Sequence, residues 1–152
     1  HSANKIILHA LKNNLIDELK DFSEIRPETK FGSNTRFDFL IFKKRDRAFI
    51  EVKNVTLSRE KEIAEFPDAI TTRGLKHINE LVKAGKKNYK IFILYLIQRN
   101  DCTSFTIAKD IDPAYASALA KAVKKKLNII CYDCKFSSKG IKLNNKINFK
   151  IK

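Results

Sequence analysis

The sequence has 152 residues, 43% of them hydrophobic and 32% charged, which is enough for one soluble, globular domain with a buried core. No apolar run approaches the length of a membrane span and no signal peptide precedes the predicted fold, so we expect a cytoplasmic protein without membrane association. The formal net charge of +14 favours polyanionic partners such as DNA or RNA, although a Lys-rich composition also fits the coding bias of an A/T-rich genome.

The predicted elements alternate between strands and helices along the chain. An amphipathic helix over residues 3–12 comes first, and its apolar stripe is Ile7, Ala10 and Leu11. Residues 24–31 predict an edge or irregular strand, because Pro27 has no N–H to donate to a strand ladder. Residues 36–43 and 47–55 predict two strands that pair antiparallel, since only a short charged turn joins them.

The second half of the chain predicts a parallel α/β arrangement. The run 58–65 is charged and predicts a loop, and the following helix is expected to begin at a cap on Asp68 or Thr72 and to end at Gly85. Residues 90–98 form an unbroken apolar run, which indicates a central strand covered on both faces. The remaining predicted elements are a short strand near Phe105, a helix from Asp112-Pro113 to about 126, a strand over 128–136 and an alternating strand over 140–151. The whole chain, 1–152, is therefore predicted to be one mixed α/β domain.

The three cysteines are Cys102, Cys131 and Cys134, an odd number that fits a reducing compartment. Cys131 and Cys134 form a C-x-x-C spacing, but no second Cys or His pair completes a zinc site. Because the segment predicts a strand, these two side chains are expected on opposite faces of the sheet. Met is absent, so we expect a processed product or a piece of a longer protein.

Acidic residues interrupt two neighbouring apolar strands. Asp38 lies in the first strand, and Glu51-Val52-Lys53 lies in the second, with Phe49, Glu51 and Lys53 on one face. Two carboxylates on adjacent strands come close enough to share one Mg²⁺ or Mn²⁺ ion, with the carbonyl of Val52 as a third ligand. Lys53 would then hold the attacking water or the charge that develops on phosphorus. The alternative interpretation is a buried ion pair of Lys53 with either carboxylate and no metal.

Four segments resemble the sugar fermentation stimulation protein family, SfsA. The longest runs from Phe66-Pro67-Asp68-Ala69 to Thr72-Arg73-Gly74-Leu75-Lys76-His77, and the others are Arg36-Phe37-Asp38-Phe39-Leu40, Glu51-Val52-Lys53-Asn54-Val55 and Gln98-Arg99-Asn100-Asp101. Asn4 and the helix start at Ile111-Asp112-Pro113 also fit. The resemblance implies a bacterial DNA-binding protein linked to sugar, especially maltose, metabolism.

The resemblance also implies a fold and a set of site residues. The fold is the restriction-endonuclease-like, PD-(D/E)XK, mixed sheet flanked by helices, with Asp38, Glu51 and Lys53 at the catalytic positions. Arg73, Lys76 and His77 would bind phosphates, and Gln98 would line the same pocket. The alternative is that Arg73 and Lys76 pair with Asp68 and Glu80. Family members carry an additional N-terminal OB-like domain, which we expect to be absent from this chain.

Two functions of different class follow from these residues. The first is a Mg²⁺-dependent nuclease, and the second is a DNA-binding regulator that keeps the fold without turnover. In both, the absence of a recognition-helix pattern predicts DNA binding with little sequence specificity. A homo-oligomer is compatible with either function.

Overall fold

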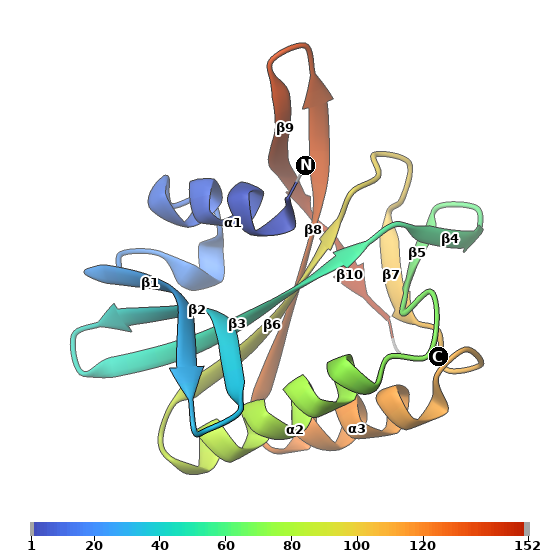
Figure 1. Ribbon diagram of the computed structural model, residues 1–152. Coiled ribbons are helices and arrows are strands. Elements are labelled where there is room, and N and C mark those ends of the chain that lie inside the picture. The colour runs from blue at the N-terminus through green and yellow to red at the C-terminus, as the bar shows by residue number, and fades with distance from the viewer. Residues whose placement is uncertain (1, 151–152) are drawn as a thin grey trace.

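A computed structural model describes residues 2–150. A six-stranded mixed sheet forms the centre of the molecule, with the strand order β1-β2-β3-β6-β8-β9 (Figure 1). Its strands are β1 (Glu24–Phe31), β2 (Thr35–Lys43), β3 (Asp46–Val55), β6 (Lys90–Ile97), β8 (Leu127–Ser137) and β9 (Gly140–Lys146). The predicted α/β, restriction-endonuclease-like fold with a mixed sheet flanked by helices is confirmed.

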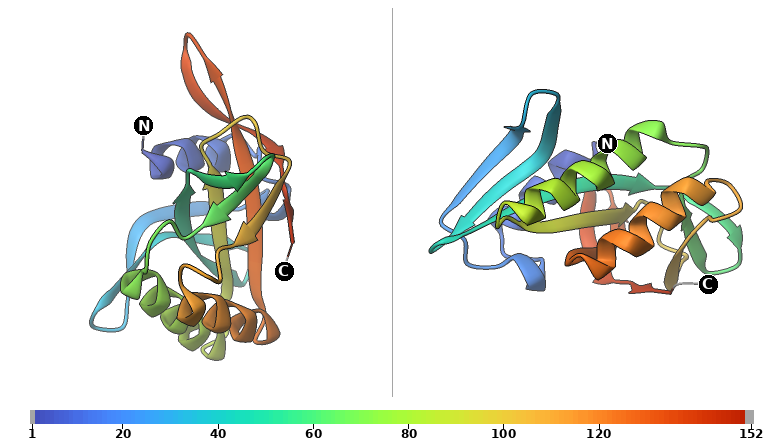
Figure 2. Two further views of the ribbon diagram at one scale, coloured as in Figure 1. Left: turned by 90° about the vertical axis from the view of Figure 1, so that its right-hand side faces the viewer. Right: turned by 90° about the horizontal axis from the view of Figure 1, so that it is seen from below.

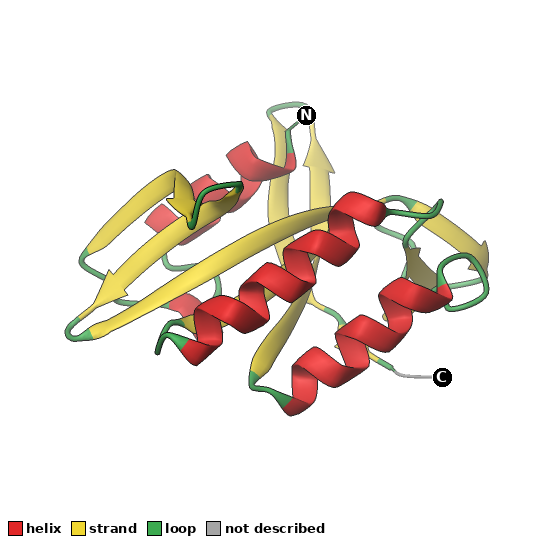
Figure 3. Ribbon diagram, turned by 60° about the horizontal axis from the view of Figure 1, so that its bottom comes forward, coloured by secondary structure: helices red, strands yellow, loops and turns green. Residues whose placement is uncertain are grey.

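Helices cover both faces of this sheet. Helices α2 (Thr72–Lys86) and α3 (Pro113–Lys124) lie side by side on one face (Figure 3), while α1 (Ala3–Lys12) and the 3-10 turn η1 (Asp17–Leu19) pack on the other. The predicted central strand is β6, which runs parallel to both β3 and β8. Its unbroken apolar run is explained by burial on both sides, since Leu94 packs in the α1-side core and Tyr95 in the α2-side core.

The antiparallel part of the sheet agrees with the sequence. β1 is an edge strand, as Pro27 requires, and β2 pairs antiparallel with both β1 and β3. Cys131 and Cys134 are free and buried on opposite faces of β8, in the α2-side and α1-side cores respectively. Within residues 2–150, none of the helices combines the length and the apolarity that crossing a bilayer requires.

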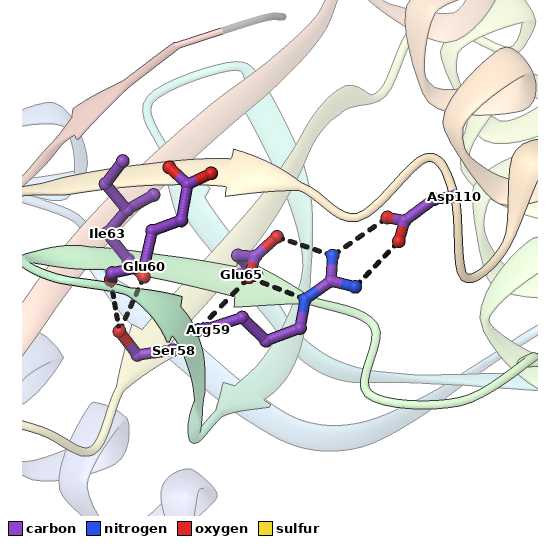
Figure 4. Close-up of polar contacts among 6 residues, drawn as sticks. All are labelled: Ser58, Arg59, Glu60, Ile63, Glu65 and Asp110. Atoms are coloured by element: carbon purple, nitrogen blue, oxygen red, sulfur yellow. Dashed lines mark hydrogen bonds and ion pairs between the residues drawn. The ribbon is translucent and has the colours of Figure 1, made fainter.

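A second sheet of four strands lies beside the first (Figure 2), and this sheet corrects the predicted loop over 58–65. Its strands are β4 (Leu57–Glu60), β5 (Ile63–Phe66), β7 (Ser104–Ile107) and β10 (Asn148–Phe149). Two of the charged residues that suggested a loop are paired: the guanidinium of Arg59 on β4 binds both Glu65 and Asp110, each through two hydrogen bonds (Figure 4). Charged side chains at these positions interrupt the apolar/polar alternation from which a strand is predicted, so the sequence indicated a loop.

The ends of the helices also differ from prediction. Thr71 caps α2, because its hydroxyl accepts a hydrogen bond from the N–H of Gly74 at 2.9 Å, so neither Asp68 nor Thr72 is the cap. The helix continues past Gly85 to Lys86, and a Cβ at Gly85 would lie 3.0 Å from Ile91 of β6. That glycine therefore permits close packing on the sheet and does not end the helix.

Helix α3 begins as predicted but ends earlier. The Asp112 carboxylate accepts from the N–H of Tyr115 at 3.0 Å and caps the helix, which ends at Lys124 and not at 126. The predicted strand over 140–151 divides into β9, the hairpin partner of β8, and β10, which joins the second sheet. Its last residue, Ile151, lies outside the described part of the chain.

Candidate active site

Asp38 and Glu51 face each other where the ladder between β2 and β3 ends. The last regular pair is Phe39 with Ile50, so Asp38 and Glu51 occupy the next position in register. There the side chains take over the bonding: the Asp38 N–H donates to Glu51 Oε1 at 3.3 Å, and the Val52 N–H donates to Asp38 Oδ2 at 2.7 Å. The two strands thus hold both carboxylates by backbone donors, which fixes their relative position.

A change of face in β2 aims Asp38 away from the regular sheet. Residues two apart in a strand share a face, yet Phe37 packs in the α2-side core and Phe39 in the α1-side core. In the neighbouring strand, Glu28 lies between the partners of these two residues and has a left-handed φ of 48°. The strand pair is therefore irregular at the level of Asp38, which frees its carboxylate to meet other groups.

Helix α1, on the face of the sheet opposite to α2, supplies a third contact to Asp38. Asn4, in the first turn of α1, donates its amide to Asp38 Oδ1 at 2.9 Å. Each oxygen of the Asp38 carboxylate consequently accepts one hydrogen bond, one from Val52 and one from Asn4. Because the first turn of α1 contacts it directly, Asp38 depends on that helix for its orientation.

Glu51, Lys53 and His77 form a compact polar group on the α2 side. Glu51 is only 3% exposed, and its Oε2 lies 3.2 Å from Lys53 Nζ and 2.8 Å from His77 Nδ1. Lys53 Nζ is also 2.9 Å from His77 Nδ1. In one tautomer His77 donates to Glu51, and in the other it accepts from Lys53, so the imidazole can exchange partners.

The two carboxyl groups have opposite electrostatic environments. Burial raises the pKa of Asp38 to about 6, and the charge of Glu51 adds to the shift, which the hydrogen bonds from Val52 and Asn4 offset in part. Burial also opposes the charged form of Glu51, but the hydrogen bond to His77 and the charge of Lys53 outweigh it and hold its pKa below the ordinary value. The site therefore keeps Glu51 ionised and makes ionisation of Asp38 costly.

A basic cleft opens beside this group. The cleft has a volume of about 500 Å³, and no acidic side chain lines it among the described residues. His77 forms part of its wall, so the cleft reaches the polar group around Glu51. Its lining residues are Lys30, Ser33, Asn34, Thr35, Arg36, Arg73, Lys76 and His77. We call these residues the basic cleft.

The predicted phosphate-binding residues divide into two places. Arg73, Lys76 and His77 lie together in the basic cleft. Within residues 2–150, no direct ion pair joins Arg73 or Lys76 to Asp68 or Glu80, and Lys76 Nζ donates to the carbonyl of Asn34 at 2.9 Å. Burial opposes ionisation of Glu80, but hydrogen bonds from Lys83 and Thr35 hold its pKa below the ordinary value, and the charge of Lys76 still contributes to that lowering.

Gln98 lies elsewhere, just beyond β6, where its amide donates to the Asn54 side chain at 2.7 Å. Asn54 is one residue beyond Lys53 in β3, so its side chain points to the other face of the sheet. Val52 contributes its N–H to the site, and the role of its carbonyl as a metal ligand stays a prediction.

Sequence reasoning did not place three contributors in the site. Asn4 matched the family pattern, but its spacing within the first helix does not reveal that it reaches Asp38 across 34 residues of chain. Lys30 and Arg36 flank the turn between β1 and β2, and their exposed positions resemble any charged hairpin. The signal that connects them is their antiparallel pairing, which places both at the same end of the hairpin.

Comparison with known proteins decides the family. The family model described as "Sugar fermentation stimulation protein RE domain" matches residues 1–140. The chain belongs to the sugar fermentation stimulation protein (SfsA) family. It is 49% identical over 147 residues to the sugar fermentation stimulation protein homolog of Pelagibacter ubique, covering 97% of this chain and 63% of the relative. The homolog of Roseobacter denitrificans is 40% identical over 149 residues, with the same two shares.

A solved SfsA structure has the same fold. It is described as the structure of Pyrococcus furiosus SfsA in complex with Ca²⁺, and it superposes with a TM-score of 0.85 at 27% identity. The match covers 93% of this chain and 61% of that protein. The chain thus spans less than two thirds of the length of its first SfsA relatives, and it matches their nuclease-like domain.

Proposed function

We propose that this SfsA domain binds DNA and cleaves phosphodiester bonds at a divalent metal held by Asp38 and Glu51. The observation that carries the proposal is the joining of two carboxylates on adjacent strands to a cleft lined by cations. A protein that only binds a polyanion has no use for two carboxylates, one buried and one half-buried, beside its binding surface, because they repel the ligand. A nuclease needs both, since the carboxylates hold the metal and the cations hold the phosphates.

The residues present fit a divalent cation. Burial raises the pKa of Asp38 to about 6, and the charge of Glu51 adds to the shift, so the two carboxylates repel each other at close range. A cation between them would remove this repulsion, and oxygen ligands of this type are those that Mg²⁺ and Mn²⁺ prefer. The related Pyrococcus furiosus SfsA, solved in complex with Ca²⁺, supports the use of divalent metals in the family. When bound, the metal would neutralise phosphate charge and make water more acidic.

The chain's own side chains would perform the remaining steps. Lys53 carries its ammonium next to Glu51, where it orients the attacking water and stabilises negative charge on the phosphoryl oxygens. His77 Nδ1 donates to Glu51 in one tautomer and accepts from Lys53 in the other, so His77 acts as a positioning residue for whichever of the two it binds. Arg73 and Lys76 would bind the flanking phosphates in the basic cleft. Contacts of this kind depend on phosphate charge, so we expect affinity that falls steeply with salt and little sequence preference.

Cleavage of supercoiled plasmid in Mg²⁺ or Mn²⁺ tests the proposal directly. Wild-type protein should nick or linearise the plasmid, and Asp38→Ala should not. Gel-shift binding of the same DNA by both proteins would show that the variant has lost turnover and not folding. If neither metal supports cleavage while DNA still binds, the nuclease proposal fails.

A second function is favoured by one specific observation. Both neighbours of Glu51 Oε2 are protein side chains, Lys53 and His77, and no group of three or more metal-binding side chains exists within residues 2–150. A site closed by its own ion pair would suit a DNA-binding regulator of sugar, especially maltose, metabolism that does not turn over. The free, buried cysteines suit either function in a reducing bacterial cytoplasm.

A further inference from the structure

The hairpin between β8 and β9 extends beyond the body of the domain (Figures 1 and 2). Cys134 of β8 and Leu143 of β9 form its last buried cross-strand pair. Beyond that pair, the residues from Lys135 to Lys142 are exposed or half-buried, and a two-residue loop closes the strands. We call residues 135–142 the hairpin arm. A segment without buried residues adds little to the stability of the core, so its composition needs another explanation.

The arm combines cations without acids and one exposed aromatic ring. Lys135, Lys139 and Lys142 form no ion pair with any of the residues 2–150, whereas Lys146 below the arm is paired with Glu18 at 2.6 Å. Lys135 and Lys142 are direct cross-strand partners, an arrangement of like charges that destabilises a hairpin. Phe136 is 45% exposed and is the only aromatic residue of exposed class in the described chain.

Protection of a sheet edge explains only part of this pattern. Lysines on edge strands block pairing with other chains, and Lys142 lies on the edge strand β9. The same explanation also covers Lys135 of β8, because the pairing of β8 with β6 ends at Asp133. It does not cover Phe136, since an exposed Phe would promote association and not prevent it. A polyanion with exposed ring faces satisfies both features, because phosphates neutralise the lysines and a base stacks on the aromatic ring.

The first turn of α1 connects the arm to the candidate site. Ala3 of α1 packs in the same apolar cluster as Ile141 of the arm, and the next residue, Asn4, donates to Asp38. Within the sheet, β9 is three strands from β3, about 15 Å at the usual strand spacing, and Lys135 lies six residues along β8 from the level of Glu51, about a further 20 Å. The resulting separation of about 25 Å is shorter than one turn of B-DNA, whose repeat is about 34 Å. A duplex that reaches Glu51 can therefore also reach the arm.

We propose that the hairpin arm is a second DNA contact, in which Lys135, Lys139 and Lys142 bind phosphates and Phe136 stacks on a base. This inference rests on the proposed DNA binding and extends it to a surface outside the basic cleft. Stacking requires an accessible base face, so the arm favours single-stranded, frayed or kinked DNA over a regular duplex.

The lysine contacts are tested by a triple variant with a matched control. Lys135→Ala, Lys139→Ala and Lys142→Ala together should lower the slope of log affinity against log salt by about 2–3, because each lost phosphate contact on B-DNA lowers it by about 0.9. The control is the triple substitution Lys124→Ala, Lys125→Ala and Lys126→Ala, which removes the same charge from exposed positions at the end of α3. Equal effects of the two triples would overturn the proposal, because net charge alone would then explain the loss.

The aromatic contact is tested by Phe136→Ala and Phe136→Tyr. With DNA that carries 2-aminopurine in an unpaired stretch, wild type and Phe136→Tyr should change the fluorescence on binding, and Phe136→Ala should not. Phe136→Ala should also bind that DNA at least about fivefold more weakly, the lower limit for loss of one stacked base. If wild type binds DNA and Phe136→Ala shows the same affinity and the same fluorescence change, the proposed DNA contact of the hairpin arm is refuted, while the proposed function stands. Failure of wild type to bind any DNA would refute the proposed function itself.

Discussion

The two ends of this domain use charged residues in opposite ways. In the second sheet, the guanidinium of Arg59 binds Glu65 and Asp110, so the cation is fully paired within the protein. In the basic cleft, Lys30, Arg36, Arg73 and Lys76 lie together with no carboxylate in the lining. A net charge of +14 therefore does not spread evenly. The chain pairs its charges where they hold strands together and leaves them unpaired where a polyanion would bind.

The buried carboxylates repeat this contrast and give the prediction with the largest effect. Glu51 and Glu65 are both buried beside a cation, Lys53 and Arg59 respectively. We expect Glu51→Gln to lower the cleavage rate by at least about 100-fold, which corresponds to about 3 kcal/mol of lost transition-state stabilisation. Glu65→Gln should lower the melting temperature and leave cleavage per folded molecule unchanged. Plasmid cleavage measures the rate per folded molecule, and thermal unfolding measures the melting temperature, for both variants.

The opposite pattern would remove the distinction between the two carboxylates. If Glu51→Gln only lowers stability and cleavage follows the folded fraction, Glu51 belongs to a structural ion pair like that of Glu65. Lys53→Met then provides a second test, because a structural pair loses stability with either partner removed. If Lys53 is catalytic, Lys53→Met should instead lower the cleavage rate while DNA affinity is retained.

Removal of cleft cations should affect DNA binding and not stability. We expect the double substitution Arg73→Ala and Lys76→Ala to weaken DNA binding by about tenfold at moderate salt and to lower the salt slope by about 2. The control Lys83→Ala and Lys86→Ala removes the same charge from exposed positions on the same helix. Arg59→Ala should do the reverse of the cleft variant, with DNA affinity retained and a lower melting temperature, because it leaves Glu65 buried and unpaired.

The two aspartates of these regions titrate at different pH. Asp110 beside Arg59 has its pKa lowered to about 2, whereas burial and Glu51 raise the pKa of Asp38 to about 6. Between pH 4 and pH 6 the folded protein therefore holds a proton on Asp38 that the unfolded chain releases, so this group costs stability as the pH rises through that range. Relative to Asp38→Asn, which cannot ionise, wild type should lose stability from pH 4 to pH 7 in urea unfolding.

Metal binding should show the same titration. Because a metal competes with the proton on Asp38, the affinity for Mn²⁺ should fall by about tenfold per pH unit below pH 6. Saturating Mn²⁺ at pH 7 should also raise the stability of wild type and not that of Asp38→Asn. A Mn²⁺ affinity that does not change between pH 5 and pH 7 would contradict the assignment of Asp38 as a ligand.

Strand alternation and turn chemistry predicted most of the main sheet. Pro27 placed β1 at an edge, and the apolar run at 90–98 predicted a strand covered on both faces. In the second sheet the predicted strand near Phe105 is confirmed as β7, but β4 and β5 were missed. Those two strands are held by pairs such as Arg59 with Asp110, which no local pattern contains. The extent of α2 was misread for a similar reason, since Gly85 is required by the nearness of Ile91 and not by a helix end.

The sequence predicted the two carboxylates of the site, but not the residues that orient them or line the cleft beside them. The Asp38 and Glu51-Val52-Lys53 spacing places both carboxylates on paired strands, and the structure brings them together with His77. The cleft residues Lys30 and Arg36 and the contact from Asn4 were not predicted, because each depends on how separate elements dock. Local sequence patterns therefore identify the carboxylates on a strand, whereas the packing of separate elements determines which residues orient those carboxylates.

Asn4 gives the smallest expected effect and the sharpest test of that docking. Asn4→Ala removes the hydrogen bond to Asp38 Oδ1, which favours the charged carboxylate, so the pKa of Asp38 should rise further. Loss of an orienting partner typically costs about 10-fold or more in metal affinity, and we expect a loss near 10-fold in Mn²⁺ binding at pH 7. Asn4→Asp places a new carboxylate beside Asp38. Repulsion between these two carboxylates would weaken metal binding, whereas a metal that bridges them would offset that loss. Asn13→Ala, which changes the exposed end of the same helix, should leave Mn²⁺ binding unchanged. Equal losses in Asn4→Ala and Asn13→Ala would mean that α1 supports the site by packing alone, and a loss confined to Asn4→Ala would make this side chain the link between the helix and the carboxylate.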